Sequence, residues 1–100
     1  MDLVIRNGTL VTADGVFQAD IGIRGEKIVQ VHHAIPNEAR RVIDAAGLVV
    51  SPGFIDAHTH SDIRVFKHPE EDARLMQGIT TALIGQDGLS VGPIDQANKE

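Results

Sequence analysis

The chain is 100 residues long, with 42% apolar and 23% charged residues, a formal net charge of −5 and no cysteine. This composition is typical of a globular protein rather than a disordered one, and the acidic balance argues against binding to nucleic acid. The lack of cysteine excludes disulfides and thiolate zinc sites. With no signal-peptide pattern and no apolar run of about 20 residues, we expect a cytoplasmic protein that does not enter a membrane.

The first half of the sequence predicts short β-strands joined by turns. Residues 3–5 and 9–12 are apolar runs on either side of Asn7-Gly8, a pair that favours the tight turn of a β-hairpin. Asp14-Gly15 indicates the next turn, and a third turn is expected to begin at the glycine after residue 24.

Residues 17–25 alternate in hydrophobicity, which indicates a half-buried strand. One face is predicted to carry Phe17, Ala19, Ile21 and Ile23, and the other Gln18, Asp20, Gly22 and Arg24. Further strands are expected over 28–31, 41–45 and 47–53. Short strands at such regular spacing predict that residues 1–51 form a small β-sandwich segment.

The pattern changes at residue 52. Residues 53–58 predict a strand, and 68–78 carry helix signals: a proline in the first turn, three acidic residues after it and a glycine stop. The β-branched run 79–85 predicts a fully buried strand, and another helix begins in 93–100. Alternating strands and helices are typical of a parallel α/β fold. We interpret 52–100 as the incomplete start of a TIM-like (β/α)8 barrel.

The run 52-PGFIDAHTHSD-62 holds the strongest chemical signal. Because side chains alternate along a strand, Asp56, His58 and His60 are predicted to share one face. Same-face residues lie roughly 6.5–7 Å apart, close enough for two imidazoles to converge on one divalent ion or to serve adjacent ions. Two imidazoles and a carboxylate are costly to bury without partners. The pattern therefore favours a metal site over an ordinary buried strand.

Two aspartates and a serine are further candidates. Asp56 is interpreted as a partner that orients a ligating imidazole, with a strand-end hydrogen bond as the alternative. Asp62 follows the histidine pair and is a candidate to orient His60 or contact substrate, although a turn or helix cap is the favoured interpretation for a loop aspartate. Ser90 is a candidate substrate contact, although loop serines more often bond the backbone.

The same segments resemble a known family. PGFIDAHTHSD is similar to the first barrel strand of the amidohydrolase superfamily of metal-dependent hydrolases, and 78-GITTALIGQDGLSVGP-93 resembles its N-acyl-D-amino-acid deacylase (D-aminoacylase) branch. The resemblance implies a zinc enzyme, with one or two divalent ions, that hydrolyses the amide bond of N-acyl-D-amino acids through a metal-activated water. It also implies an aspartate general base beyond residue 100, so residues 1–100 alone are expected to be inactive.

The resemblance also implies a ligand set. His58 and His60 match the paired metal ligands after the first strand, and Asp87 lies where D-aminoacylases often carry a metal-ligating cysteine. A carboxylate is a harder ligand than a thiolate but still binds zinc. Asp87 is therefore predicted as a third ligand, with an ordinary loop aspartate as the alternative.

Two other functions stay open beside the deacylase. A cyclic amidase of the dihydroorotase or hydantoinase type would carry a lysine downstream that can be carboxylated. A non-catalytic assembly module with the same fold should have lost its metal ligands, whereas the histidine pair is intact here. In either enzyme the partner is a small-molecule amide, and the sequence leaves open whether the protein is a homo-oligomer.

Overall fold

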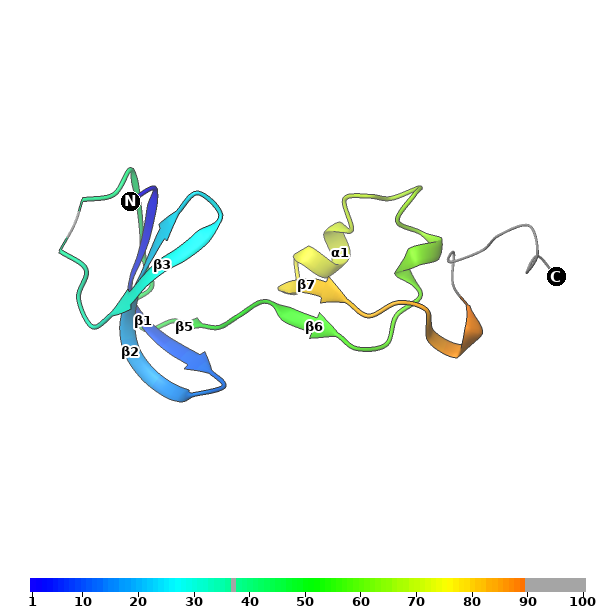
Figure 1. The fold of residues 1–100 in the computed structure, drawn as a ribbon, viewed down its shortest axis with the longest axis horizontal. Coiled ribbons are helices and arrows are strands. Elements are labelled where there is room, and N and C mark those ends of the chain that lie inside the picture. The colour runs from blue at the N-terminus through cyan, green and yellow to red at the C-terminus, as the bar shows by residue number, and fades with distance from the viewer. Residues whose placement is uncertain (37, 90–100) are drawn as a thin grey trace. The chain divides into compact units, whose positions relative to one another are not determined.

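The computed structural model describes residues 1–36 and 38–89. The chain divides into two compact units, Met1–Pro52 and Gly53–Glu100 (Figure 1). The helix expected over 93–100 lies outside the described residues. Within the described ranges, no helix is long and apolar enough to cross a membrane.

The first unit is a five-stranded mixed sheet of β1 (Leu3–Thr12), β2 (Gly15–Arg24), β3 (Lys27–His32), β4 (Arg41–Asp44) and β5 (Val49–Val50). The first three strands pair antiparallel, whereas β4 and β5 both run parallel to β1, β4 beside its first half and β5 beside its second. The predicted β-sandwich segment is thus a single mixed sheet in this part of the chain, and its pairing with a second sheet stays a prediction. β1 is long enough to pair with β4 and β5 in succession.

Asn7-Gly8 forms a β-bulge and not the predicted hairpin turn. β1 runs through both residues, and its register with β2 shifts between Ile5 and Gly8. Asn7 has a φ of 61°, in the left-handed region that asparagine tolerates better than most residues. Its N–H donates to Asp20 Oδ1 at 2.9 Å, and its Nδ2 donates to Asp44 Oδ1 at 2.9 Å. These partners lie far away in the sequence and hold the bulge.

The other two turns are confirmed. β1 ends at Thr12 and β2 begins at Gly15, so the chain reverses at the predicted Asp14-Gly15 pair. β2 ends at Arg24 and β3 begins at Lys27, with Gly25 at a φ of 57° in the turn between them. Glycine adopts this left-handed conformation without a steric cost.

The core of the first unit is small and apolar. It consists of Val4, Leu10, Ala19, Ile21, Ile35 and Ala45. The alternation predicted for β2 is only partly right, because Ala19 and Ile21 are buried whereas Phe17 is 40% exposed. Gly22, on the opposite face, is buried too, and a Cβ placed there would lie 3.3 Å from Ile35 Cδ1. The middle of β2 is thus covered on both sides.

Asp20 is the buried charged residue of this unit, although the sequence predicted it on a polar face. Its Oδ1 accepts the N–H of Asn7, and its Oδ2 accepts the N–H of Ile35 at 3.0 Å. Burial disfavours the charged carboxylate, but the two N–H donors and the nearby Arg6 outweigh it and hold the pKa of Asp20 below its ordinary value. Asp20 therefore ties the bulge and the loop before β4 to the sheet.

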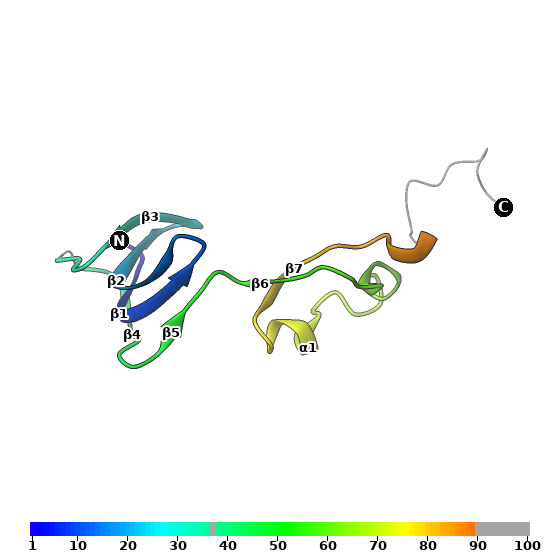
Figure 2. The ribbon, with the colours of Figure 1, turned by 90° about the horizontal axis from the view of Figure 1, so that it is seen from below.

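The second unit is built on a parallel strand pair. β6 (Phe54–Asp56) pairs with β7 (Ile79–Ala82) (Figure 2). The 3-10 turn η1 (Ser61–Ile63) and the helix α1 (Asp72–Leu75) lie between them in sequence, and η2 (Gln86–Gly88) follows β7. A parallel pair with a helix in its connection is the arrangement expected of a strand–helix–strand unit.

Two elements of this unit differ from the prediction. α1 has four residues, because Glu71 before it is left-handed, with a φ of 45°, and interrupts a helix that would start at Pro69. β7 was expected to be fully buried, yet Thr80, Thr81 and Ala82 are exposed. The described part of the unit packs one short helix against this strand.

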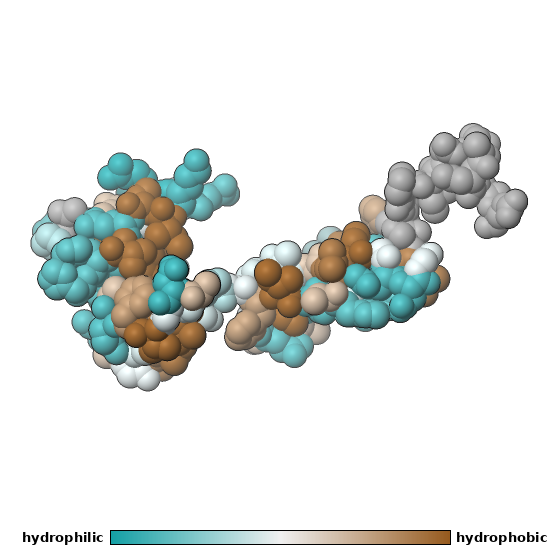
Figure 3. Space-filling model, turned by 60° about the horizontal axis from the view of Figure 1, so that its bottom comes forward, coloured by the Kyte–Doolittle hydropathy of each residue, from teal (hydrophilic) through white to brown (hydrophobic). Residues whose placement is uncertain are grey.

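Apolar side chains lie at the surface of both units (Figure 3). In the second unit the large exposed ones are Phe54, Ile55, Val65, Phe66, Leu75, Met76, Leu83, Ile84 and Leu89. Among the residues of this unit whose burial the structure gives, the buried ones are polar, namely Thr59 and Asp62. Hydrogen bonds and ion pairs therefore carry more of the local organisation here than apolar packing does.

Candidate metal centre

The histidine pair lies in a loop at the end of β6. The strand ends at Asp56, so His58 and His60 do not alternate along one strand face as predicted. Asp56 Oδ1 accepts the N–H of His58 at 3.3 Å, a local turn that bends the chain away from the strand direction. The two imidazoles reach the same place through the loop and not through strand alternation.

Asp87 comes to the site from the end of the neighbouring strand. It lies in η2, in the segment Gly85-Gln86-Asp87-Gly88 that follows β7. The backbone is left-handed at Gly85, Asp87 and Gly88, with φ values of 79°, 58° and 74°. For a non-glycine residue this conformation costs of order 1–3 kcal/mol and is often found at functional sites. Since β6 and β7 are parallel, the loops after them meet at one edge of the pair.

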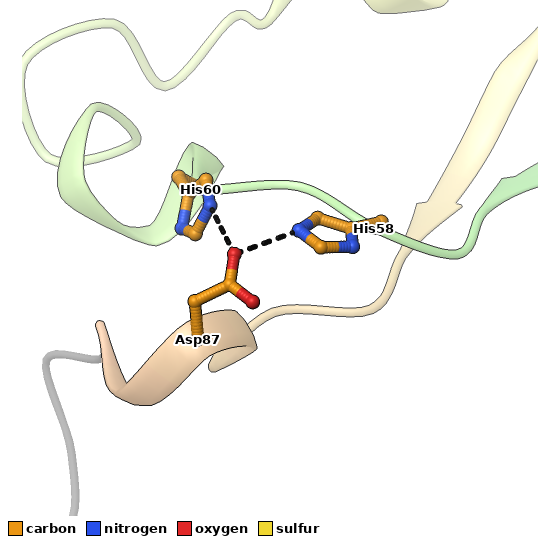
Figure 4. Close-up of side chains that lie close together, drawn as sticks. All are labelled: His58, His60 and Asp87. Carbon is orange, nitrogen blue, oxygen red and sulfur yellow. Dashed lines mark hydrogen bonds and ion pairs between the residues drawn. The ribbon is translucent and has the colours of Figure 1, made fainter.

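The three side chains converge on one carboxylate oxygen (Figure 4). The Nε2 atom of His58 lies 3.1 Å from Asp87 Oδ2, and the Nε2 atom of His60 lies 3.5 Å from the same oxygen. The imidazole rings are 5.6 Å apart between centroids and nearly perpendicular, at 75°. A donor atom from each of the three residues lies within 4.8 Å of the other two.

This arrangement fits a zinc ion. A tetrahedral zinc with bonds of about 2.0–2.1 Å separates its donor atoms by roughly 3.3 Å, close to the two observed nitrogen–oxygen distances. Two imidazoles and one carboxylate are also a donor set found in catalytic zinc sites. The side chains of His58 and Asp87 are 60% and 65% exposed, and ion pairs at such exposure contribute little to stability. Binding a cation is a better physical reason for the cluster than stabilisation of the fold.

The remaining predicted residues lie at different distances from this centre. Asp56 contacts the main chain of His58 and the Arg74 side chain, and among residues 1–36 and 38–89 it has no bond to an imidazole. Asp62 is 2% exposed, and neither carboxylate oxygen has a partner within those ranges. Its predicted contact with His60 or substrate stays a prediction. Ser90 lies outside the described residues.

Sequence reasoning missed Arg74 as a site residue. Its Nη1 donates to Asp56 Oδ2 at 2.5 Å, its Nη2 donates to Thr59 Oγ1, and its Nε lies 2.8 Å from Glu71 Oε2. In the sequence, Arg74 looks like an ordinary helix residue and Glu71 like a first-turn acid. Asp56 is 18 residues away, and no local pattern connects it to Arg74.

A cleft of about 650 Å³ borders this network. Asp56, His60 and Arg74 are among the residues that line it. Neither His58 nor Asp87 lines the cleft, so it reaches the three-residue centre through His60. The Arg74 side chain, which is 25% exposed, forms part of its wall.

Two family profiles match the chain. The profile of the amidohydrolase family matches residues 41–98, and the profile of the N-terminal domain of the urease alpha-subunit matches residues 1–54. Together they span both compact units.

Curated relatives and solved structures agree with the first of these profiles. D-aminoacylase from Alcaligenes xylosoxydans xylosoxydans is 36% identical over 99 residues, which is 97% of this chain and 20% of the relative. D-hydantoinase from Ralstonia pickettii is 50% identical over 72 residues, 72% of this chain and 16% of the relative.

The structure of N-acyl-D-glutamate deacylase from Bordetella bronchiseptica, solved with zinc and a phosphonate mimic of the tetrahedral intermediate, superposes with a TM-score of 0.86 at 32% identity. The superposition covers 98% of this chain and 21% of the deacylase chain. The chain therefore spans about a fifth of the length of these deacylase relatives. The match over more than half of the chain shows that it belongs to the amidohydrolase family.

Proposed function

We propose that this chain is part of a zinc-dependent hydrolase that cleaves the amide bond of N-acyl-D-amino acids, and that His58, His60 and Asp87 are its metal ligands. The observation that carries the proposal is the convergence of three donor atoms from the loops after two adjacent parallel strands. The similarity to D-aminoacylase and to a zinc-bound N-acyl-D-glutamate deacylase supports the choice of metal and substrate class.

The proposal includes a larger fold. In it, β6, α1 and β7 are the first part of a TIM-like (β/α)8 barrel, whose active site lies at the carboxyl ends of the strands. The general base and any further ligands would lie beyond residue 100. The cytoplasmic location and the oligomeric state considered from the sequence stay predictions.

Each residue of the centre has a defined task. The Nε2 atoms of His58 and His60 point toward Asp87 and are the two nitrogen donors offered to a cation (Figure 4). The carboxylate of Asp87 adds one negative charge, which balances half the charge of a divalent ion. A zinc ion in such a site lowers the pKa of water and polarises a carbonyl group.

Zinc affinity tests the ligand assignment directly. In the full-length natural protein, His58→Ala, His60→Ala and Asp87→Asn should each weaken zinc binding by more than about 100-fold, since removing a ligand costs more than removing a residue that supports one. A competition titration with a chromophoric chelator measures this. His33→Ala, which removes an exposed histidine of the first unit, is the matched control. Equal zinc affinity in the wild type and the three variants would refute the ligand set.

Substrate specificity tests the reaction. The zinc-loaded full-length protein should release free amino acid from N-acyl-D-amino acids faster than from the L-enantiomers, as measured by a ninhydrin assay. The 50% identity to D-hydantoinase favours a cyclic amidase as the second candidate. Faster opening of a hydantoin ring than hydrolysis of every N-acyl-D-amino acid would replace the first function with the second.

A further inference from the structure

Arg74 contacts the chain on both sides of His58. Its Nη1 donates to Asp56 Oδ2 at 2.5 Å, and its Nη2 donates to Thr59 Oγ1. Asp56 precedes His58 by two residues, and Thr59 separates the two histidines. One guanidinium group from α1 therefore holds the segment that carries both imidazoles.

The contact with Asp56 reaches the backbone of the histidine pair. The second carboxylate oxygen, Oδ1, accepts the N–H of His58 at 3.3 Å. On its remaining side, Arg74 Nε lies 2.8 Å from Glu71 Oε2. Because the guanidinium is planar with a fixed fork of donors, these contacts set the distance and angle between Asp56 and Thr59.

The network is more protected from water than the ligands it adjoins. Thr59 is 5% exposed, and the side chains of Arg74 and Asp56 are 25% and 26% exposed. The side chain of His58 is 60% exposed. Charge-assisted hydrogen bonds at low exposure are stronger than those in open solvent. Within the described ranges, the loop between β6 and η1 pairs with no strand, so these side-chain bonds contribute to its shape.

We propose that Arg74 is a positioning residue that sets the relative placement of His58 and His60 and thereby the metal affinity of the centre. The proposal rests on the proposed function, in which these histidines bind zinc. Arg74 hydrogen-bonds to Asp56 and Thr59, and among the described residues no hydrogen bond joins it to either imidazole, so it acts through these two partners.

The sign of the effect separates positioning from simple charge. Arg74 is cationic, so its removal should strengthen the binding of a cation if only the electrostatic potential mattered. A positioning role predicts weaker binding of the cation, because without Arg74 the donor atoms of His58 and His60 would no longer be held at the distances that one metal ion requires. Support of this kind is worth about 10–100-fold in metal affinity.

The main experiment measures zinc affinity in the full-length natural protein by chelator competition. Arg74→Met should weaken zinc binding by about 10–100-fold. Lys67→Met removes the same charge from an exposed residue of the same unit and should leave the affinity unchanged or slightly higher. Arg74→Lys keeps the charge but lacks the fork of donors, and should recover only part of the lost affinity.

A second variant tests the proposal even if Arg74→Met does not fold. Thr59→Val removes only the hydroxyl that accepts from Arg74, and should weaken zinc binding by about 2–10-fold with an unchanged circular dichroism spectrum. If Arg74→Met does not fold, Thr59→Val alone decides the question. Wild-type affinity in Thr59→Val under those conditions would overturn the proposal.

Two further measurements report on the placement of the two imidazoles around the metal ion. The visible absorption spectrum of the cobalt-substituted protein should change in Arg74→Ala, because the ligand field depends on the placement of the imidazoles. Ethylguanidinium, which the cleft beside Arg74 can admit, should restore the wild-type spectrum and part of the affinity in Arg74→Ala. It should change neither the spectrum nor the affinity of Lys67→Met. An unchanged spectrum together with wild-type zinc affinity in Arg74→Ala and Arg74→Met would refute positioning.

The His60→Ala variant separates the two proposals. If His60→Ala weakens zinc binding and Arg74→Met does not, the metal centre stands and the positioning role fails. If neither variant changes zinc binding, the proposed metal centre fails first, and the role of Arg74 fails with it.

Discussion

The two units of this chain bury opposite kinds of side chain. Among the residues that the structure describes, every buried apolar one (Val4, Leu10, Ala19, Ile21, Ile35 and Ala45) belongs to the first unit. In the part of the second unit whose burial the structure gives, the buried residues are Thr59 and Asp62. The first is a sheet held by apolar packing, and the second is a strand pair whose loops are organised by polar contacts.

The difference separates stability from chemistry. In the first unit, each oxygen of the buried Asp20 carboxylate accepts a backbone N–H group, which ties this side chain to the fold. In the second, His58, His60 and Asp87 each place a donor atom within 4.8 Å of the other two, on side chains that are 60%, 36% and 65% exposed. Polar groups on loops at strand ends are available for binding, whereas those inside a sheet serve the fold.

The largest expected effect tests the core of the first unit. Leu10→Ala should lower the free energy of unfolding by about 2–5 kcal/mol, because it leaves a cavity among packed side chains. Leu75→Ala in α1, which is 57% exposed, should change it by less than about 0.5 kcal/mol. Urea denaturation of residues 1–100 measures both. Equal losses would break the contrast between the two units.

Zinc should stabilise only the second unit. At a free zinc concentration 100 times the Kd, the gain is about 2.7 kcal/mol. The amide of Leu83, which donates to the Asp56 carbonyl at 2.8 Å, should then exchange its hydrogen about 100-fold more slowly. The amide of Thr9, bonded to the Leu48 carbonyl at 3.0 Å, is the internal control. Equal slowing at both amides would contradict a local site.

The pH dependence of stability should follow Asp20. Its folded pKa lies below the ordinary value of 3.8, so its contribution is fully present above about pH 3.8 and disappears as the pH falls through the folded pKa. Asp20→Asn should lose about 1.5–3 kcal/mol at pH 7, since an amide replaces a charged acceptor. Urea unfolding between pH 7 and pH 2 should show that the free energies of unfolding of the wild type and of Asp20→Asn converge at low pH. A constant difference across this range would exclude Asp20 as the source.

A smaller effect is expected where β6 begins. A Cβ on Gly53 would lie 2.7 Å from the Cβ of Thr80 in β7, so Gly53→Ala should cost about 1–3 kcal/mol through overpacking. Adding Thr80→Ala removes the nearer Oγ1 and Cγ2 atoms and should restore part of the loss. Thermal unfolding followed by circular dichroism measures both variants. Wild-type stability in Gly53→Ala would show that the strand pair adapts freely.

Local patterns predicted some features and failed at others for identifiable reasons. The turns at Asp14-Gly15 and Gly25 follow from local glycine preferences, and both are confirmed, with the N–H of Gly25 also donating to Asp2 Oδ2 at 2.7 Å. Asn7-Gly8 was predicted to be a hairpin turn, but the bonds of Asn7 to Asp20 and Asp44 hold a bulge. A dipeptide preference cannot anticipate partners that the fold brings from 13 and 37 residues away.

By itself, the sequence determined which donor groups this protein offers. His58, His60 and Asp87 are recognisable from their motifs and from resemblance to a family, and the chemistry of imidazole and carboxylate follows from residue type. Only the tertiary structure decided that they meet, because parallel pairing of β6 and β7 brings together loops whose residues lie 29 positions apart. It also revealed Arg74, whose contacts exist only once α1 lies beside the end of β6.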